Sequence, residues 1–242
     1  MLARRIRAMR GPHWLALFGA VLLAWAALIA MAVPAGDSYA RALVETLCAP
    51  SGGFWSTLTM WALMSGAMMA PTALPAFATY EDLGSQTATR FGHLVAGYLL
   101  IWLGFAVLAA LGQTVLTRAG LLDTLGTSRV PLFSAALLVG AGLYQFSTLK
   151  EACLSRCRAP LTFFMQHWDE GPFRNGLRLG MDCLGCCWAL MALAWVGGVM
   201  NLGFMALAMV LMLLEKLPDL GRRITKPLGV VLIASGAITA FM

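Results

Sequence analysis

The fold is decided by residues 178–216, which read "RLGMDCLGCCWALMALAWVGGVMNLGFMALAMVLMLLEK". Residues 183–214 carry no charged side chain. This run exceeds the roughly 20 residues that one transmembrane helix needs and falls short of two such helices with a turn. Arg178 precedes the run and Lys216 follows it. Because loops rich in Lys and Arg stay in the cytoplasm, both ends belong to one side, and the sequence predicts two crossings that turn at Gly197 to Asn201.

The composition places the whole chain among integral membrane proteins. Of its 242 residues, 60% are hydrophobic and 12% are charged, and no long polar segment stands apart. We therefore expect one all-α integral membrane domain over residues 1–242, a polytopic bundle of about seven helices with a cytoplasmic N-terminus. Six helices is the alternative, because the last apolar run is short. The predicted helices span 13–35, 54–77, 92–113, 130–149, 176–197, 201–215 and 227–242.

The basic residues orient this bundle. With seven crossings, 14 of the 17 Lys and Arg residues fall on the cytoplasmic side, and only Arg41, Arg118 and Arg129 fall outside. The net charge of +6 is thereby explained without nucleic acid as a partner. The apolar run Trp14 to Val33 is longer than the roughly 7–15 apolar residues of a signal peptide, so we expect it to be retained as the first helix.

The connection at about 150–175 is predicted to be an amphipathic cytoplasmic segment. Pro160 ends any continuation of the preceding helix. The residues that follow, "LTFFMQHW" (161–168), are typical of a helix that lies in the membrane interface.

Three cysteines and one aspartate form the main candidate site. Cys183, Cys186 and Cys187 are spaced i, i+3, i+4, which puts their side chains on one helical face. Asp182 lies at the edge of that face. An ionisable group within a bilayer is costly and usually functional or paired, and Arg178, four residues earlier, is the candidate pairing partner.

More sulfur is expected at the same depth of the membrane. Cys153 and Cys157 lie four residues apart at the cytoplasmic end of the fourth helix, and Met68 and Met69 lie deep in the second. Thiolates and thioethers select soft metals, so the pattern predicts a copper(I) site, with zinc or another soft metal as the alternative. Simple packing of methionine and small cysteine side chains is the competing interpretation.

Two other function classes remain open. Clustered cysteines also suit a membrane thiol-disulfide oxidoreductase that passes electrons to a quinone, although disulfides are rare on the reducing side of the membrane. The second open class is a non-catalytic subunit that anchors or assembles a partner protein. The chain lacks a nucleophile triad, a phosphate loop and a haem-attachment motif, so the sequence favours a protein that is not an enzyme.

Five further segments stand out: "WALMSGAMMAP" (61–71), "YQFSTLKEACLSRCRAP" (144–160), "CLGCCWALM" (183–191), "GGVMNLGFMAL" (197–207) and "EK" (215–216). Together they resemble the DUF2182 family, predicted metal-binding integral membrane proteins of bacteria. The resemblance runs from Trp61 onward, although the family pattern has a histidine near the position of Leu179 that this chain lacks. It implies a multi-pass protein of the bacterial inner membrane that contacts lipid and binds a soft metal, with a metallochaperone or metalloprotein as partner. The sequence does not determine the oligomeric state.

Overall fold

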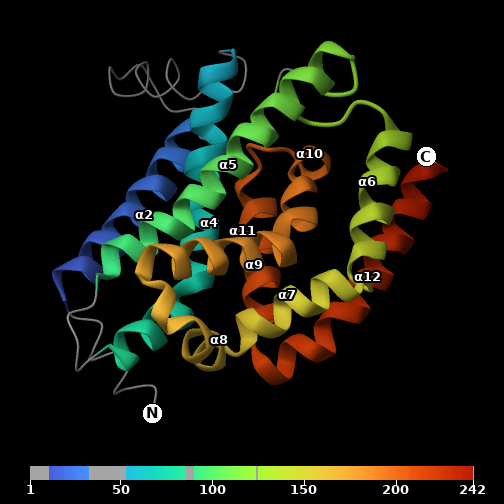
Figure 1. Ribbon diagram of the computed structural model, residues 1–242. Helices are drawn as coiled ribbons and strands as arrows, with labels where there is room; N and C mark the ends of the chain where they lie inside the picture. Colours follow the sequence, from blue (N-terminus) through green and yellow to red (C-terminus); the bar gives the residue numbers. More distant parts are fainter. Residues whose placement is uncertain (1–10, 33–52, 85–89, 124, 242) are drawn as a thin grey trace.

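The computed structural model describes residues 11–32, 53–84, 90–123 and 125–241, and these are helical apart from turns and short connections (Figure 1). The all-α prediction is confirmed for this part of the chain, while the N-terminus and the last residues of the predicted helix 13–35 lie outside it. The helices are α2 (Pro12–Ala32), α4 (Phe54–Leu83), α5 (Phe91–Arg118), α6 (Pro131–Tyr144), α7 (Thr148–Arg158), α8 (Pro160–His167), the 3₁₀ turn η1 (Trp168–Glu170), α9 (Pro172–Ala192), α10 (Ala194–Gly197), α11 (Leu202–Lys216) and α12 (Pro218–Ala240).

Four helices in the described residues are long and apolar enough to cross a membrane, namely α2, α5, α9 with α10, and α12. A fifth is formed if α6 and α7, which meet at 62°, count as one span. At about 1.5 Å per residue, α11 with its 15 residues is short against a hydrocarbon core of about 30 Å. The structure thus supports a membrane protein, and the number of seven crossings stays a prediction.

Successive long helices alternate in direction. Trp25 of α2 donates to Ala67 O of α4 while Trp14 reaches Glu81, so α2 and α4 are antiparallel. In the same way, α4 runs against α5, because Trp61 Nε1 donates to Gln113 Oε1 (2.7 Å) while Phe77 packs on Phe91. The contacts described below for α6, α9, α11 and α12 continue this alternation along the chain.

The α5–α9 contact is built on glycine. A Cβ on Gly176 of α9 would collide with Leu94 O of α5, and a Cβ on Gly97 of α5 would collide with Phe173 O of α9. Small residues let helix backbones approach this closely in membranes. Farther along, Gly180 abuts Tyr98 O, so the two helices run parallel. This contact brings the middle of α5 against the cysteine-bearing part of α9.

The other half of the bundle is held by α6 and α12, an antiparallel pair at one side of the molecule (Figure 1). Here too the contact depends on small residues. Gly142 of α6 meets Gly229 and Ile233 of α12, and Gly236 of α12 meets Ala135 of α6. Tyr144 at the end of α6 donates to Gly185 O of α9 (2.5 Å) and joins this pair to the rest of the bundle.

The turn predicted at Gly197 to Asn201 is present. It begins after α10, where Gly198 has a φ of 91°, a conformation that favours glycine. Asn201 then caps α11, because its Oδ1 accepts a hydrogen bond from Phe204 N (3.1 Å). The chain returns beside α9, since Lys216 at the end of α11 contacts Cys183.

Several predicted boundaries were wrong: α4 ends at Leu83 rather than at 77, α5 at Arg118 rather than at 113, and α9 begins at Pro172 rather than at 176. Two further differences have a clear physical reason. The helix predicted over 130–149 ends at Tyr144 and bends into α7, because Ser147 caps a new helix by accepting from Lys150 N (3.1 Å). The last helix begins at Pro218 rather than at 227. Proline suits the first turn of a helix, since the N–H that it lacks would be unpaired there anyway. The predicted break at Pro160 is present, with α7 ending at Arg158.

A buried ion pair between Lys150 and Glu215 joins α7 to α11. Lys150 Nζ lies 2.8 Å from Glu215 Oε2, and each side chain is 1% exposed. Arg158 adds a second link, because its Nε donates to Glu215 O (2.9 Å) and its guanidinium reaches Thr225 Oγ1 of α12 (3.2 Å). The ends of α7, α11 and α12 are thereby held together beside the cysteines.

Candidate metal centre

Three thiols converge on the buried face of α9. The Sγ atoms of Cys183, Cys186 and Cys187 all lie within 4.8 Å of one another, and each residue is 1% exposed. The Sγ atoms of Cys186 and Cys187 are 3.3 Å apart. This grouping follows from the i, i+3, i+4 spacing, since α9 is a regular helix over Pro172–Ala192.

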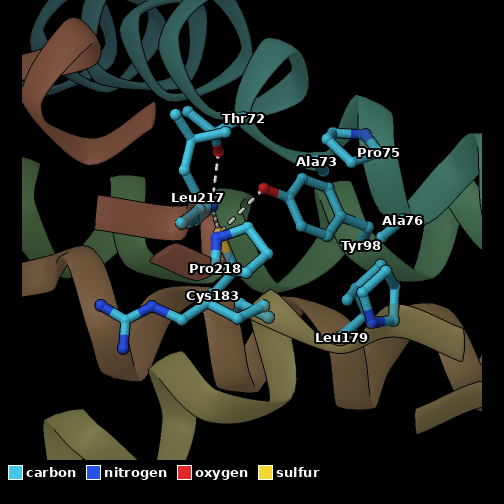
Figure 2. A pocket seen from close by; sticks show the side chains of 13 residues that line it. Thr72, Ala73, Pro75, Ala76, Tyr98, Leu179, Cys183, Leu217 and Pro218 are labelled. Carbon is cyan, nitrogen blue, oxygen red and sulfur yellow. Dashed lines mark hydrogen bonds between the residues drawn. The ribbon is translucent and has the colours of Figure 1, made fainter. Parts of the chain in front are cut away.

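Neighbouring helices supply polar groups to Cys183. Tyr98 of α5 lies with its hydroxyl 3.0 Å from Cys183 Sγ and also donates to Met69 O (2.9 Å). Lys216 Nζ lies 3.0 Å from the same sulfur and 2.6 Å from Thr72 Oγ1 of α4. In Figure 2, Tyr98 and Thr72 both extend toward Cys183. Cys183 therefore contacts polar groups of two other helices, Tyr98 of α5 and Lys216 of α11, and Lys216 in turn contacts Thr72 of α4.

The two cysteines of α7 lie on different sides of α9. Cys157 contacts Cys186 and lines the same cavity as Cys183. Cys153 packs instead against Gly185, where a Cβ would lie 2.5 Å from its Sγ, and it lines a separate apolar pocket with Tyr144 and Trp188. The structure brings Cys157, but not Cys153, to the side of the cluster.

Asp182 faces α7 and is paired. Arg156 donates to Asp182 Oδ1 at 3.0 Å. The candidate partner Arg178 pairs with Glu170 instead, at 2.6 Å, so that expected ion pair was wrong. The reason is the bend after α6, which brings Arg156 of α7 against the middle of α9. Asp182 is not part of the sulfur group.

The predicted methionines are buried. Met68 and Met69 are 2% and 0% exposed, and both belong to the same core cluster as the three cysteines of α9. Met69 contributes its backbone carbonyl to Tyr98. Burial of this kind suits both a packing role and a role as a reserve of soft sulfur.

Three residues of the site were not singled out from the sequence, namely Tyr98, Thr72 and Lys216. The sequence marked Lys216 only as a cytoplasmic flank and as part of the "EK" motif (215–216), although its position close after a run of apolar residues was a usable signal. Nothing local marks Tyr98 or Thr72, because their roles come from the crossing of α4 and α5 with α9.

The donor set is one of soft ligands. Among the described residues, the group of three that could hold a metal consists of cysteines alone. Bonds of about 2.3 Å from sulfur to metal put two sulfurs roughly 4.6 Å apart across a linear site and closer in a trigonal one. Because the present spacing is within 4.8 Å, small rotations of the side chains suffice for either geometry.

A family model described as "PpoB2: Copper chaperone" matches residues 58–239, a range that covers most of α4, nearly all of α12, the helices between them and every cysteine named above. Neither the curated proteins nor the solved structures yielded a match.

Proposed function

Because the chain belongs to the copper chaperone family PpoB2, we propose that it binds Cu(I) within the membrane and buffers, transports or delivers it. The observation that carries the proposal is the convergence of Cys183, Cys186 and Cys187 within 4.8 Å. Sulfur ligands select Cu(I) over hard ions. A structural zinc site almost always has four ligands, whereas this group has three. Agreement between the family and the donor atoms favours copper.

We propose a role for each candidate site residue, beginning with the three cysteines of α9. Cys183, Cys186 and Cys187 hold the ion. Cys157, which contacts Cys186, is the next sulfur along a relay toward the end of the bundle where α7 and α8 meet. Met68 and Met69 form a reserve of thioether on α4. Asp182, paired with Arg156, fixes α7 against α9 so that Cys157 stays in place, and Cys153 packs between these helices.

A direct test is metal content and thiol state. Protein purified anaerobically in detergent is expected to take up one Cu(I) ion per chain, and bound copper should protect the three cysteines of α9 from alkylation. No disulfide should be found by mass spectrometry of metal-free protein from cells. A disulfide between Cys157 and Cys186 in that sample would favour the oxidoreductase instead, since thiol exchange needs such a pair.

We also propose that the site lies toward the cytoplasmic side of a bacterial inner membrane. Gly171 precedes α9 and Gly120 follows α5, and since these helices run parallel, the two glycines lie at opposite ends of the bundle. A reporter fused after Gly171 should be cytoplasmic and one fused after Gly120 external. Reversed labelling would contradict the assignment of the site to the cytoplasmic half.

A further inference from the structure

Cys183 lies in the wall of a cavity of about 210 Å³ (Figure 2). The cavity is bounded by α4, α5 and α9 and by the ends of α7 and α11. Its rim includes Leu217, which is 46% exposed. Drug-sized ligands occupy pockets of roughly 300–1,000 Å³, so this smaller space suits a small molecule and excludes a folded protein. The cavity therefore provides a route from the surface to one thiol of the cluster.

The cavity wall is positively charged. Lys216 and Arg158 line it, and no carboxylate does among the described residues. Arg158 forms an ion pair with Glu151, whose Oε1 lies 3.3 Å from Arg158 Nη1. The hydrogen-bond partners of Lys216 are Thr72 and Cys183, neither of which is a carboxylate. The nearby acids are engaged elsewhere, Glu215 with Lys150 and Asp182 with Arg156.

This placement disfavours a bare cation as the incoming species. A Cu⁺ ion that approached Cys183 through the cavity would meet the ammonium group 3.0 Å from the sulfur. Repulsion between like charges is strong where water is scarce. A copper complex with net negative charge would be attracted by the same group.

We propose that the cavity receives Cu(I) as an anionic bis-thiolate complex of a low-molecular-weight thiol, and that Lys216 positions this complex beside Cys183. The inference rests on the proposed function and specifies the form in which its cargo arrives. The positive charge of Lys216 attracts the anionic complex. Its hydrogen bond to Thr72 keeps the ammonium group next to Cys183.

The transfer is a ligand exchange without redox change. The Cu–S bond to one small thiolate breaks as a bond from Cu to Cys183 Sγ forms, and the proton of the Cys183 thiol leaves with the departing thiolate as a neutral thiol. A second exchange at Cys186 releases the second small thiol in the same way. Copper remains Cu(I), and the complex keeps a charge of −1 throughout. The +1 charge of Lys216 balances it in the buried site.

The test uses three donors that differ only in the charge of the thiol. Cu(I) complexes of mercaptoethanesulfonate, mercaptoethanol and cysteamine carry net charges of −3, −1 and +1. Their rates of transfer to the full chain in detergent are measured by stopped flow at low salt. We expect the sulfonate complex to load at least 10-fold faster than the cysteamine complex, which is the lower end of electrostatic steering. Lys216→Met should remove most of this difference, and Lys216→Arg should retain it.

Lys226→Met is the matched control, since Lys226 is an exposed lysine of α12 and its loss changes the net charge equally. Equal rates for the three donors with the unsubstituted protein would overturn the inference even if Lys216→Met failed to fold. The same holds if Lys226→Met removed the difference as fully as Lys216→Met. Binding of copper at rates independent of donor charge would leave the proposed function intact, whereas absence of binding from every donor would overturn that function itself.

Discussion

Replacing Cys186 and Cys187 together with serine is expected to weaken Cu(I) binding by about 10,000-fold. Structural zinc sites with four ligands bind with roughly 10–16 kcal/mol, or about 3 kcal/mol per ligand, and each 1.4 kcal/mol is a factor of ten. Serine leaves a hard hydroxyl where a soft ligand is needed. Competition with a Cu(I) chelator of known affinity, under anaerobic conditions, measures the loss.

Cys153→Ser is the matched control for this experiment. Cys153 is also buried, but it packs against Gly185 on another side of α9, so its replacement should change the affinity less than about threefold. Cys183→Ser should also lower the affinity for Cu(I), because only two sulfurs of the group remain. If the double serine variant retained the affinity of the unsubstituted protein, the three thiols would not be the copper site.

Replacing Lys150 with methionine is expected to destabilise the protein by about 3–5 kcal/mol. Glu215 would then keep a buried carboxylate without its counter-charge, and removal of one partner of a buried ion pair costs this much. For a chain of this size, the melting temperature should fall by roughly 10 °C. Thermal unfolding in detergent, followed by circular dichroism, provides the measurement.

The double variant Lys150→Met with Glu215→Met distinguishes the ion pair from simple packing. Two apolar side chains of similar volume often replace a buried ion pair with little or no loss, so most of the stability should return. A double variant as unstable as Lys150→Met would mean that the lysine stabilises the bundle by some other contact. Arg156→Met should cost less than Lys150→Met, since the ion pair that it breaks is open to solvent on the Arg156 side, where 62% of the side chain is accessible.

The features that the sequence predicted well are local. Apolar runs marked where the helices lie, since about 20 apolar residues give a membrane helix whatever surrounds them. Pro160 marked the end of α7 because proline cannot continue a helix. Gly197 to Asn201 marked the turn before α11 because glycine permits a positive φ and asparagine caps the helix that follows. The common face of the α9 cysteines followed from 3.6 residues per turn.

Features that depend on how one helix is rotated against another were not predictable. Cys153 and Cys157 share one face of α7, yet one reaches Gly185 and the other Cys186. The choice between Arg156 and Arg178 as partner of Asp182 depended on the 62° bend between α6 and α7. Such angles are set by packing at many small contacts, and no short segment encodes them.

The sequence by itself determined an all-helical membrane protein with three sulfurs on one helical face, because hydropathy and helical periodicity act over single segments. Only the tertiary structure decided what surrounds those sulfurs. Tyr98 and Lys216 meet Cys183 from two other helices, and Thr72 of α4 contacts Lys216 there. Their meeting depends on the backbone of Gly176 lying directly against α5 and on α11 returning beside α9. These contacts join residues far apart in the chain, and therefore they exist only once the bundle is packed.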